Sequence, residues 1–457
     1  MATLTTALFN SAQALQVIGQ SLAVTQNNVT NAQTPGWAKQ VQTVEARPLD
    51  IPEGLPGGTY AGPLVSTRDT YAEASVEQQQ SALNFSQQTV SDLQNLQPLF
   101  DLTAASGVSG AIDNLFDSFS QLSINPNDTV SRQNVLTQAQ TTAQAFQQAA
   151  QGIMSQGSTV ETETAGTVSD INRLGGIIAQ INSQTQVNED GSVDAGVDAQ
   201  MYSTLEQLSQ DVNFTTIRGS DGKISVYLGG QTPLVLGDTA YTIQGNFSLP
   251  QAEITDQNGS DITGQLTGGQ IGSEINTTNN LLPSYLSGLN TLAQTLADQV
   301  NTTLAGGLDQ NGQAPTEDLF QYDNSSDAAF SLSVNPLTPD QVAAASADAP
   351  GGNGNALALS ALATAKVVNG YTFSAAFGNL GGQVGQDVSN AQSEQQAQQN
   401  LLTQAQNLRQ QVSGVDLDQE AANLINEQSA YQATAKMFDI LNTLDDAVLG
   451  MIPAASS

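Results

Sequence analysis

Residues 415–452 have the sequence VDLDQEAANLINEQSAYQATAKMFDILNTLDDAVLGMI, in which apolar side chains recur at alternating spacings of four and three. The stretch 1–31, MATLTTALFNSAQALQVIGQSLAVTQNNVTN, repeats this pattern at the opposite end of the chain. Such a repeat gives the a and d positions of a coiled-coil seam. We therefore expect two amphipathic terminal helices that pair with each other, and we expect the pair to pack against further copies of itself.

The seam residues are the candidate assembly interface. They are Leu4, Leu8, Leu15, Ile18, Leu22 and Val29 in the first helix, and Leu417, Leu424, Tyr431, Phe438, Leu441 and Val448 in the second. Periodicity predicts equally well an ordinary helical bundle that brings its termini together, because seams of this kind also form the cores of single chains.

Composition restricts the classes of partner. The length of 457 residues favours roughly two to four domains. Only 12% of residues are charged, and Gln, Asn, Ser and Thr take their place. Such an uncharged polar surface would suit dense packing against identical copies. A composition bias of the source lineage explains it equally well. The net charge is −33, from 43 acids and 10 scattered bases. Binding to nucleic acid or to an anionic membrane needs clustered bases, so neither is expected.

The residues of a catalytic site are missing from the sequence. The chain contains no Cys and no His, which removes disulfides, thiol nucleophiles, the usual zinc ligands and the usual general base. The loops 256–261 and 309–312 faintly resemble calcium loops but lack the acid at the twelfth position, so turn chemistry is the expected role. We expect a protein that is not an enzyme and has no catalytic residue, no metal site and no cofactor.

Targeting features are equally sparse. No stretch is long and apolar enough to span a membrane, so no membrane insertion is expected. The first base is Lys39, and the 38 residues before it carry no charge, unlike a standard secretory signal. Any export machinery would have to recognise an N-terminal segment that is uncharged and is not cleaved.

The order of elements along the chain follows from periodicity and from Pro and Gly. Helices are predicted over 3–31, over most of 67–182 with a break at Asn125-Pro126, and over 199–210, 274–305, 383–411 and 415–452. Residues 48–63 are rich in Pro and Gly, which predicts a loop or short hairpin. Alternating runs on both sides of Asp221-Gly222 predict a hairpin, with further strands at 233–236 and 241–243. Residues 306–356 are loop-rich, with short strands possible at 330–334.

The predicted fold is mainly α with an inserted β domain, in an elongated, nested multi-domain rod with paired terminal coiled-coil helices. Residues 1–47 and 412–457 would form a terminal assembly domain. Residues 48–210 and 273–411 would form a helical rod domain, and 211–272 the small inserted β domain. Such an insertion requires the two ends of the inserted segment to lie close together.

Two stretches resemble a known family, the axial proteins of the bacterial flagellum, which comprise rod, hook and hook-associated proteins. The first motif is residues 27–37, and its characteristic residues are Asn28, Asn31, Pro35, Gly36 and Trp37. The second is residues 413–424, with Gly414, Asp416, Leu417 and Glu420. The interior stretches 224–237 and 267–272 resemble the branch of the family that joins hook to filament. Trp37 stands where the family usually has Tyr, and Ala38-Lys39 replaces Ser-Arg.

This resemblance implies a structural adaptor that forms a ring at the hook–filament junction. It implies contacts with further copies, with the hook protein and with the second hook–filament junction protein, and a flagellar export chaperone bound to the C-terminal helix. It also implies export by the flagellar type III apparatus without a cleaved signal peptide, an extracellular location, and ends that fold only on assembly. Two alternatives stay open: another axial subunit of the rod or hook, and a secreted enzyme such as a peptidoglycan hydrolase.

Overall fold

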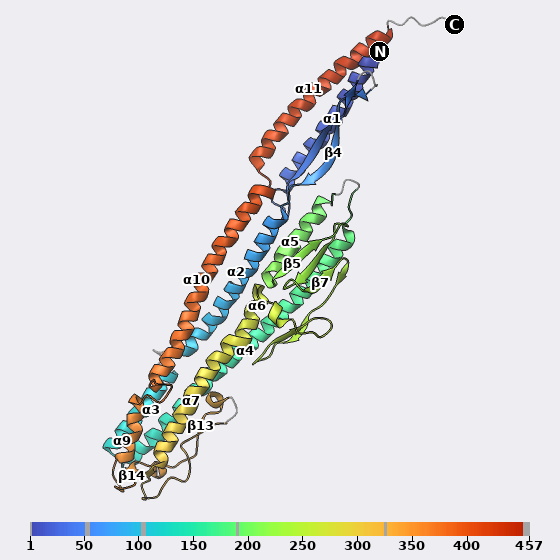
Figure 1. Cartoon of the computed structure of the whole chain (residues 1–457). Helices are drawn as coiled ribbons and strands as arrows, with labels where there is room; N and C mark the ends of the chain where they lie inside the picture. Colours follow the sequence, from blue (N-terminus) through green and yellow to red (C-terminus); the bar gives the residue numbers. More distant parts are fainter. Residues whose placement is uncertain (1, 51–54, 102–106, 189–191, 324–326, 451–457) are drawn as a thin grey trace. The chain divides into compact units, whose positions relative to one another are not determined.

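The computed structural model describes residues 2–50, 55–101, 107–188, 192–323 and 327–450 (Figure 1). The chain forms two compact units: unit 1 comprises residues 1–81, 171–242 and 399–457, and unit 2 comprises residues 82–170 and 243–398. Long helices with a few small sheets confirm the predicted mainly α class with inserted strands. These two compact units do not coincide with the three predicted domains. The predicted domain boundaries therefore stay a prediction.

Unit 1 contains the terminal helices, α1 (Ala2–Asn31) and α11 (Leu417–Gly450), which pack side by side (Figure 1). They run antiparallel, since Thr25 contacts Glu427 whereas Asn28, further along α1, contacts Glu420. The strands β1 (Gln40–Ala46) and β4 (Thr59–Ser66) form an antiparallel hairpin that packs on α1, with the short pair β2 (Leu49–Asp50) and β3 (Leu55–Pro56) near its tip. The hairpin predicted at 48–63 thus begins earlier, at Gln40.

A small sheet completes unit 1. Its strands are β5 (Phe214–Arg218), β6 (Ile224–Leu228), β7 (Thr232–Leu236) and β8 (Thr239–Ala240), in sequential antiparallel order. The predicted Asp221-Gly222 turn is confirmed, with Gly222 at φ +80°. The side chain of Asn182 anchors the sheet to α4 (Thr129–Gln184), because its amide donates to the carbonyls of Ile224 and Gly237 and accepts from the Ile224 N–H. The strand predicted at 241–243 is wrong: after Tyr241 bonds to Leu234 the chain leaves the sheet.

Two further helices belong to unit 1, the second of them only with its first residues. Helix α5 (Ala195–Asp211) begins where Asp194 accepts hydrogen bonds from the Gly196 and Val197 N–H groups. Helix α2 (Thr70–Leu96) begins in the same way, with the Asp69 carboxylate accepting from Tyr71 and Ala72. α2, α4 and α10 (Phe373–Ser413) each contribute a stretch to both units.

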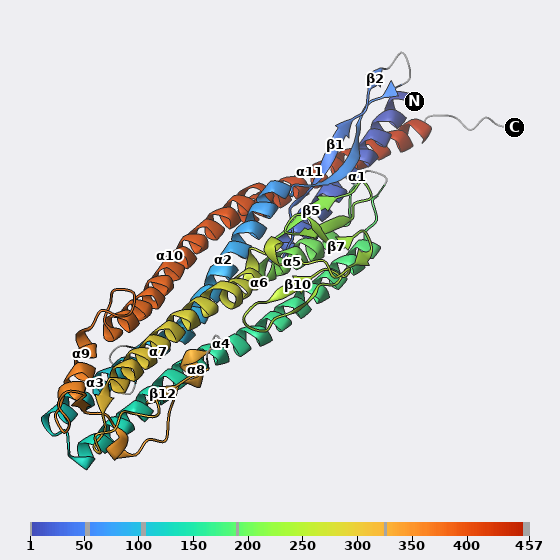
Figure 2. The ribbon, with the colours of Figure 1, turned by 60° about the horizontal axis from the view of Figure 1, so that its bottom comes forward.

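Unit 2 holds the larger hydrophobic core. Its helices are α3 (Val108–Ile124), α6 (Gly269–Asn276), α7 (Leu282–Ala305), α8 (Ala328–Ser331) and α9 (Gly354–Ala361), with parts of α2, α4 and α10. The predicted seam of α4 is buried here at Phe146, Ile153 and Val160. Figure 2 shows α8 lying against α7. Phe100 packs against the rings of Tyr285 and Phe377 at the centre of the core.

Several predicted boundaries in unit 2 need correction. The helix expected over 274–305 is α6 and α7 joined by a π-helical turn, Thr277–Leu281. The strand suggested at 330–334 is the end of α8 followed by β13 (Ser333–Val334), which pairs with β12 (Phe320–Gln321). Two more short pairs occur, β9 (Gln244–Asn246) with β10 (Glu253–Thr255), and β11 (Gly307–Leu308) with β14 (Ala345–Ser346). α10 begins ten residues before the expected 383.

The two calcium-like loops are ordinary turns. The Asp256 carboxylate accepts hydrogen bonds from the N–H groups of Asn258 and Ser260, and Asp309 does the same for Asn311 and Gln313. Within the described ranges, no group of three or more potential ligand side chains is placed to hold a metal ion.

Candidate assembly site

The pair of terminal helices leaves most of its apolar side chains incompletely covered. Leu4, Leu8, Leu15, Ile18 and Leu22 on α1, and Leu424, Phe438 and Leu441 on α11, are half-buried. The other predicted seam residues, Val29, Leu417, Tyr431 and Val448, are exposed. Of the described apolar side chains on the two helices, only Val17 is fully buried, at 6% exposure. Pairing within one chain therefore covers only part of the predicted interface.

Polar contacts between α1 and α11 fix how the two helices align. The Thr25 hydroxyl donates to Glu427 at 3.3 Å, and the Asn28 amide donates to Glu420 at 3.4 Å. Burial is the main cause that raises the pKa of Glu427, opposed by the Thr25 hydrogen bond. A polar layer in a helix pair favours one register because any shift leaves its buried groups without partners.

The structure brings the two predicted motifs together at the base of this helix pair. Asn28 holds residue Gln40 by two hydrogen bonds, donating to its carbonyl at 2.8 Å and accepting from its N–H at 2.9 Å. Lys39 forms an ion pair with Glu420 at 2.7 Å, and the Glu420 side chain is only 2% exposed. The Lys39 N–H also donates to the Ser413 carbonyl at 2.9 Å. Lys39, two residues after the first motif, thus ties that part of the chain to the second motif.

The remaining motif residues shape the chain on either side of this contact. The Asn31 side chain bonds Asn27 and accepts from the Thr34 hydroxyl, which forms the turn after α1. Asp416 caps α11 by accepting from the N–H groups of residues 418 and 419. Leu417, beside it, is exposed, and Pro35 is exposed within the turn.

Gly36 and Gly414 are closely packed, whereas Trp37 borders a cavity. Gly36 has φ +72°, and a Cβ there would lie 2.1 Å from the carbonyl oxygen of Ala199 on α5. Trp37 lines a cavity of about 520 Å³ with Ile177 and Ile181 of α4 and residues of α5. A Cβ at Gly414 would lie 2.5 Å from the Gln410 carbonyl oxygen. These positions therefore attach the two motifs to the helices of unit 1.

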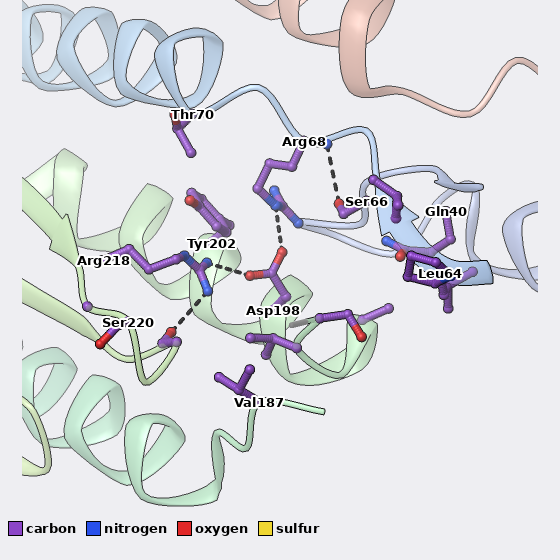
Figure 3. Close-up of a pocket in the computed structure, with 17 residues that line it drawn as sticks. Gln40, Leu64, Ser66, Arg68, Thr70, Val187, Asp198, Tyr202, Arg218 and Ser220 are labelled. Carbon is purple, nitrogen blue, oxygen red and sulfur yellow. Dashed lines mark hydrogen bonds and ion pairs between the residues drawn. The ribbon is translucent and has the colours of Figure 1, made fainter. Parts of the chain in front are cut away.

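A charged cluster that the sequence did not predict lies next to the motifs (Figure 3). Arg68 binds Glu73 at 2.5 Å and Asp198 at 2.7 Å, and it donates to the Gly36 carbonyl at 2.6 Å. Arg218 binds the other oxygen of Asp198 at 2.6 Å. Arg68, Asp198 and Arg218 border a cavity of about 430 Å³. Because each arginine is paired with acids of the same chain, the cluster joins elements of unit 1 and offers no unpaired charge to an anion.

The cluster extends to α10 through Arg409, which binds Glu206 at 2.9 Å and Glu73 at 3.2 Å. Burial, reinforced by the neighbouring Glu73 and Glu206, raises the pKa of Glu77 to about 7. The sequence signal for this cluster was weak, because its bases are dispersed over three hundred residues and only the fold places them together.

Comparison with known proteins matches the region of the second motif and the fold. The family model "Flagellar hook-associated protein FlgK helical domain" matches residues 93–320, and "Flagellar basal body rod FlgEFG protein C-terminal" matches residues 409–451. The chain is 24% identical to the flagellar hook-associated protein 1 of Bacillus subtilis (strain 168), covering 96% of each chain. It is also 24% identical to the protein of that name from Salmonella typhimurium, covering 97% of this chain and 98% of the relative.

A solved structure has the same fold. "The structure of the flagellar hook junction protein FlgK from Burkholderia pseudomallei" matches with a TM-score of 0.66 and 17% sequence identity, over 74% of this chain and all of the other. None of the helices in the described ranges combines the length and hydropathy of a membrane span.

The joined terminal motifs, the paired helices and these matches define a structural axial protein of the bacterial flagellum. Within that class, the chain belongs to the flagellar hook-associated protein 1 family.

Proposed function

We propose that the protein is a structural adaptor that forms a ring at the hook–filament junction and assembles through α1 and α11. The observation that carries this proposal is the incomplete cover of the terminal helices: Val29, Leu417, Tyr431 and Val448 stay exposed even though α1 and α11 are paired. Exposed apolar stripes of this length are costly in water, and further copies of the same pair would cover them.

The neighbours of the ring are inferred from the family. The hook protein is the proposed proximal partner, and the second hook–filament junction protein the distal one. A flagellar export chaperone is the proposed partner of α11 before assembly, because Phe438, Leu441 and Leu444 would otherwise favour aggregation. Export through the flagellar type III apparatus, without a cleaved signal peptide, would place the protein outside the cell.

The terminal helices are proposed to become stably ordered only on assembly. Among the described side chains of α1 and α11, Val17 is the one apolar residue that is fully buried, so the isolated pair gains little hydrophobic stabilisation. In hydrogen exchange on the free chain, amides of 1–40 and 415–457 should exchange quickly while those of 130–180 stay protected. Strong protection at both ends would contradict this part of the proposal.

Electron microscopy of cells that lack the gene tests the main proposal. Hooks without filaments, with filament protein released to the medium and restored by the wild-type gene, are the expected result. Complete filaments would contradict a junction role. Missing hooks would instead favour the alternative, a rod or hook subunit.

A further inference from the structure

We propose that the π-helical turn 277–281 is a joint that couples the protonation of two buried acids, Asp92 and Glu274, to the attachment of an arm. The arm is residues 243–262, which contain β9 and β10. While both acids are neutral, the turn holds the arm against α4. When they ionise, the turn opens and the arm is released. Every part of this joint lies in unit 2.

Three helices and the π-helical turn meet at the two acids. Asp92 on α2 is 1% exposed, and its Oδ2 accepts from the Thr277 hydroxyl at 2.8 Å. Glu274 on α6 is fully buried, and its Oε1 accepts from the Thr167 hydroxyl of α4 at 2.9 Å. Glu274 and Thr277 are three residues apart, so they are neighbours on one face of the helix. The first residue of the turn is thus bonded to one acid and lies beside the other.

The ionisable groups that face the two acids are themselves acids. The Gln88 amide donates to Asp92 and to Glu163 of α4, at 2.9 Å from each carboxylate. Further along, Asp387 of α10 accepts from the Tyr285 hydroxyl of α7 at 2.7 Å. None of these groups can neutralise a negative charge on Asp92.

The bases of the chain lie elsewhere. Arg132 and Lys366 are the two bases in the sequence of unit 2. Arg132 precedes Glu163 on the same helix by roughly 45 Å, and Lys366 is exposed in the segment before α10. Asp170 and Arg173, the next charged residues along α4, are exposed. Buried carboxylates without a paired base are costly, so the folded state favours their neutral form.

The two acids change charge near neutral pH. Burial is the main cause that raises the pKa of Asp92 to about 7 and that of Glu274 to about 8. Because the folded state holds these protons more tightly than an open state would, the joint is closed at pH 6 and weakens as the pH rises through both values. The two titrations are coupled, since each negative charge raises the pKa of the other group.

The same turn also holds the arm. Asn279, two residues after Thr277, donates to the Ala252 carbonyl at 3.0 Å and accepts from the Ala252 N–H at 2.6 Å. Leu249 of the arm packs so closely on α4 that a Cβ at Gly157 would lie 2.1 Å from its Cδ1. The arm is therefore fixed to α4 by packing and to the turn by the Asn279 side chain.

One short turn thus connects the acids with the arm. A π-helical turn is rarely stable by itself, so the contacts of its side chains decide whether it persists. Opening of the turn would let water reach the ionised acids, and Asn279 would move away from Ala252 with it. Release of the arm would also open a cavity of about 550 Å³ that Leu249 and Pro250 line beside α4 and α7.

Native-state hydrogen exchange of the full chain at pH 6 and pH 8.5 tests this joint. Labelling times are corrected for the intrinsic pH dependence of amide exchange. Low concentrations of urea separate local opening from global unfolding, since only global unfolding depends strongly on urea. In the wild-type chain, amides of 252–256 should exchange through a local opening that is at least tenfold more frequent at pH 8.5. In Glu274→Gln this increase should be at least fivefold smaller.

Two more variants are matched to this measurement. Glu253→Gln removes an exposed acid of the arm itself, so it should keep the wild-type pH dependence. Asn279→Ala removes the bond between turn and arm. Its arm should open more often at both pH values and lose most of its pH dependence, whereas amides of 270–278 keep theirs.

Several results would overturn the inference and leave the adaptor function standing. Local opening of the wild-type arm that is equally frequent at both pH values would do so, as would exchange through global unfolding alone. A pH dependence that persists in Glu274→Gln would show that other groups control the arm. Wild-type pH dependence of the arm in Asn279→Ala would show that the turn is not the link.

Discussion

Glu274→Gln should stabilise unit 2 at alkaline pH but not at acidic pH. Glu274 on α6 is completely buried, and its Oε1 accepts from the Thr167 hydroxyl at 2.9 Å. Its Oε2 has no hydrogen-bond partner among the described residues. The buried Asp92 lies nearby, bonded to Thr277 at 2.8 Å. Burial is the largest cause that raises the pKa of Glu274 to about 8 and that of Asp92 to about 7.

The direction of the pH effect follows from these pKa values. In the unfolded chain a glutamate titrates near 4.5, so between pH 5 and 8 the unfolded state is ionised while the folded state keeps its proton. The folded state then binds more protons, and the free energy of unfolding falls as the pH rises. At about 1.4 kcal/mol per pKa unit, three pH units give at most about 4 kcal/mol for one carboxyl group. Because the folded state can relax around the charge, we expect about 2 kcal/mol.

Urea unfolding of the full chain at pH 5 and pH 8, followed by hydrogen exchange in 267–285, measures this effect. The wild-type chain should lose about 2 kcal/mol more than Glu274→Gln over this pH range. Glu317→Gln, which removes an exposed acid of the same unit, is the control and should follow the wild type. Equal destabilisation of Glu274→Gln at both pH values would refute the reasoning.

Four further substitutions test other parts of the structure. Gly36→Ala should destabilise unit 1 by about 2–4 kcal/mol, because its φ is +72° and the added Cβ would meet the Ala199 carbonyl; an unchanged melting temperature would contradict this. Arg132→Met should speed amide exchange in 335–345, because the buried guanidinium donates to the carbonyls of Pro126 and Val342; unchanged exchange would count against that role. Phe438→Asp and Leu424→Asp should each leave the melting temperature of the monomer unchanged and block assembly. If either variant unfolds the monomer, α11 belongs to the core of the monomer.

The long helices were predictable because their sequence signals are local. The start of α4 at Thr129 follows from Asn125-Pro126 and from the Asp128 carboxylate, which accepts from the Ser131 N–H. The hairpin around Gly222 was equally clear, since Asp-Gly between alternating runs has few other interpretations. At these two places a short local pattern decides the backbone, and sequence and structure agree.

Features that depend on distant residues were not predictable. The π-helical turn at 277–281 interrupts a regular helical pattern beside two buried acids, and the pattern contains no sign of it. The pairing of Arg68 with Asp198 joins residues far apart in the chain. In the terminal helices the heptad pattern predicted the seam, but it did not distinguish half-buried Phe438 from exposed Tyr431, because that difference depends on where α1 lies.

Labelling the protein in intact flagella tests the adaptor role most directly. An epitope inserted at the exposed turn 256–260, with motility retained, would be detected with gold-conjugated antibody in the electron microscope. The proposed role predicts a single band of gold where the hook meets the filament. Gold along the whole hook, along the rod or over the cell body would contradict it.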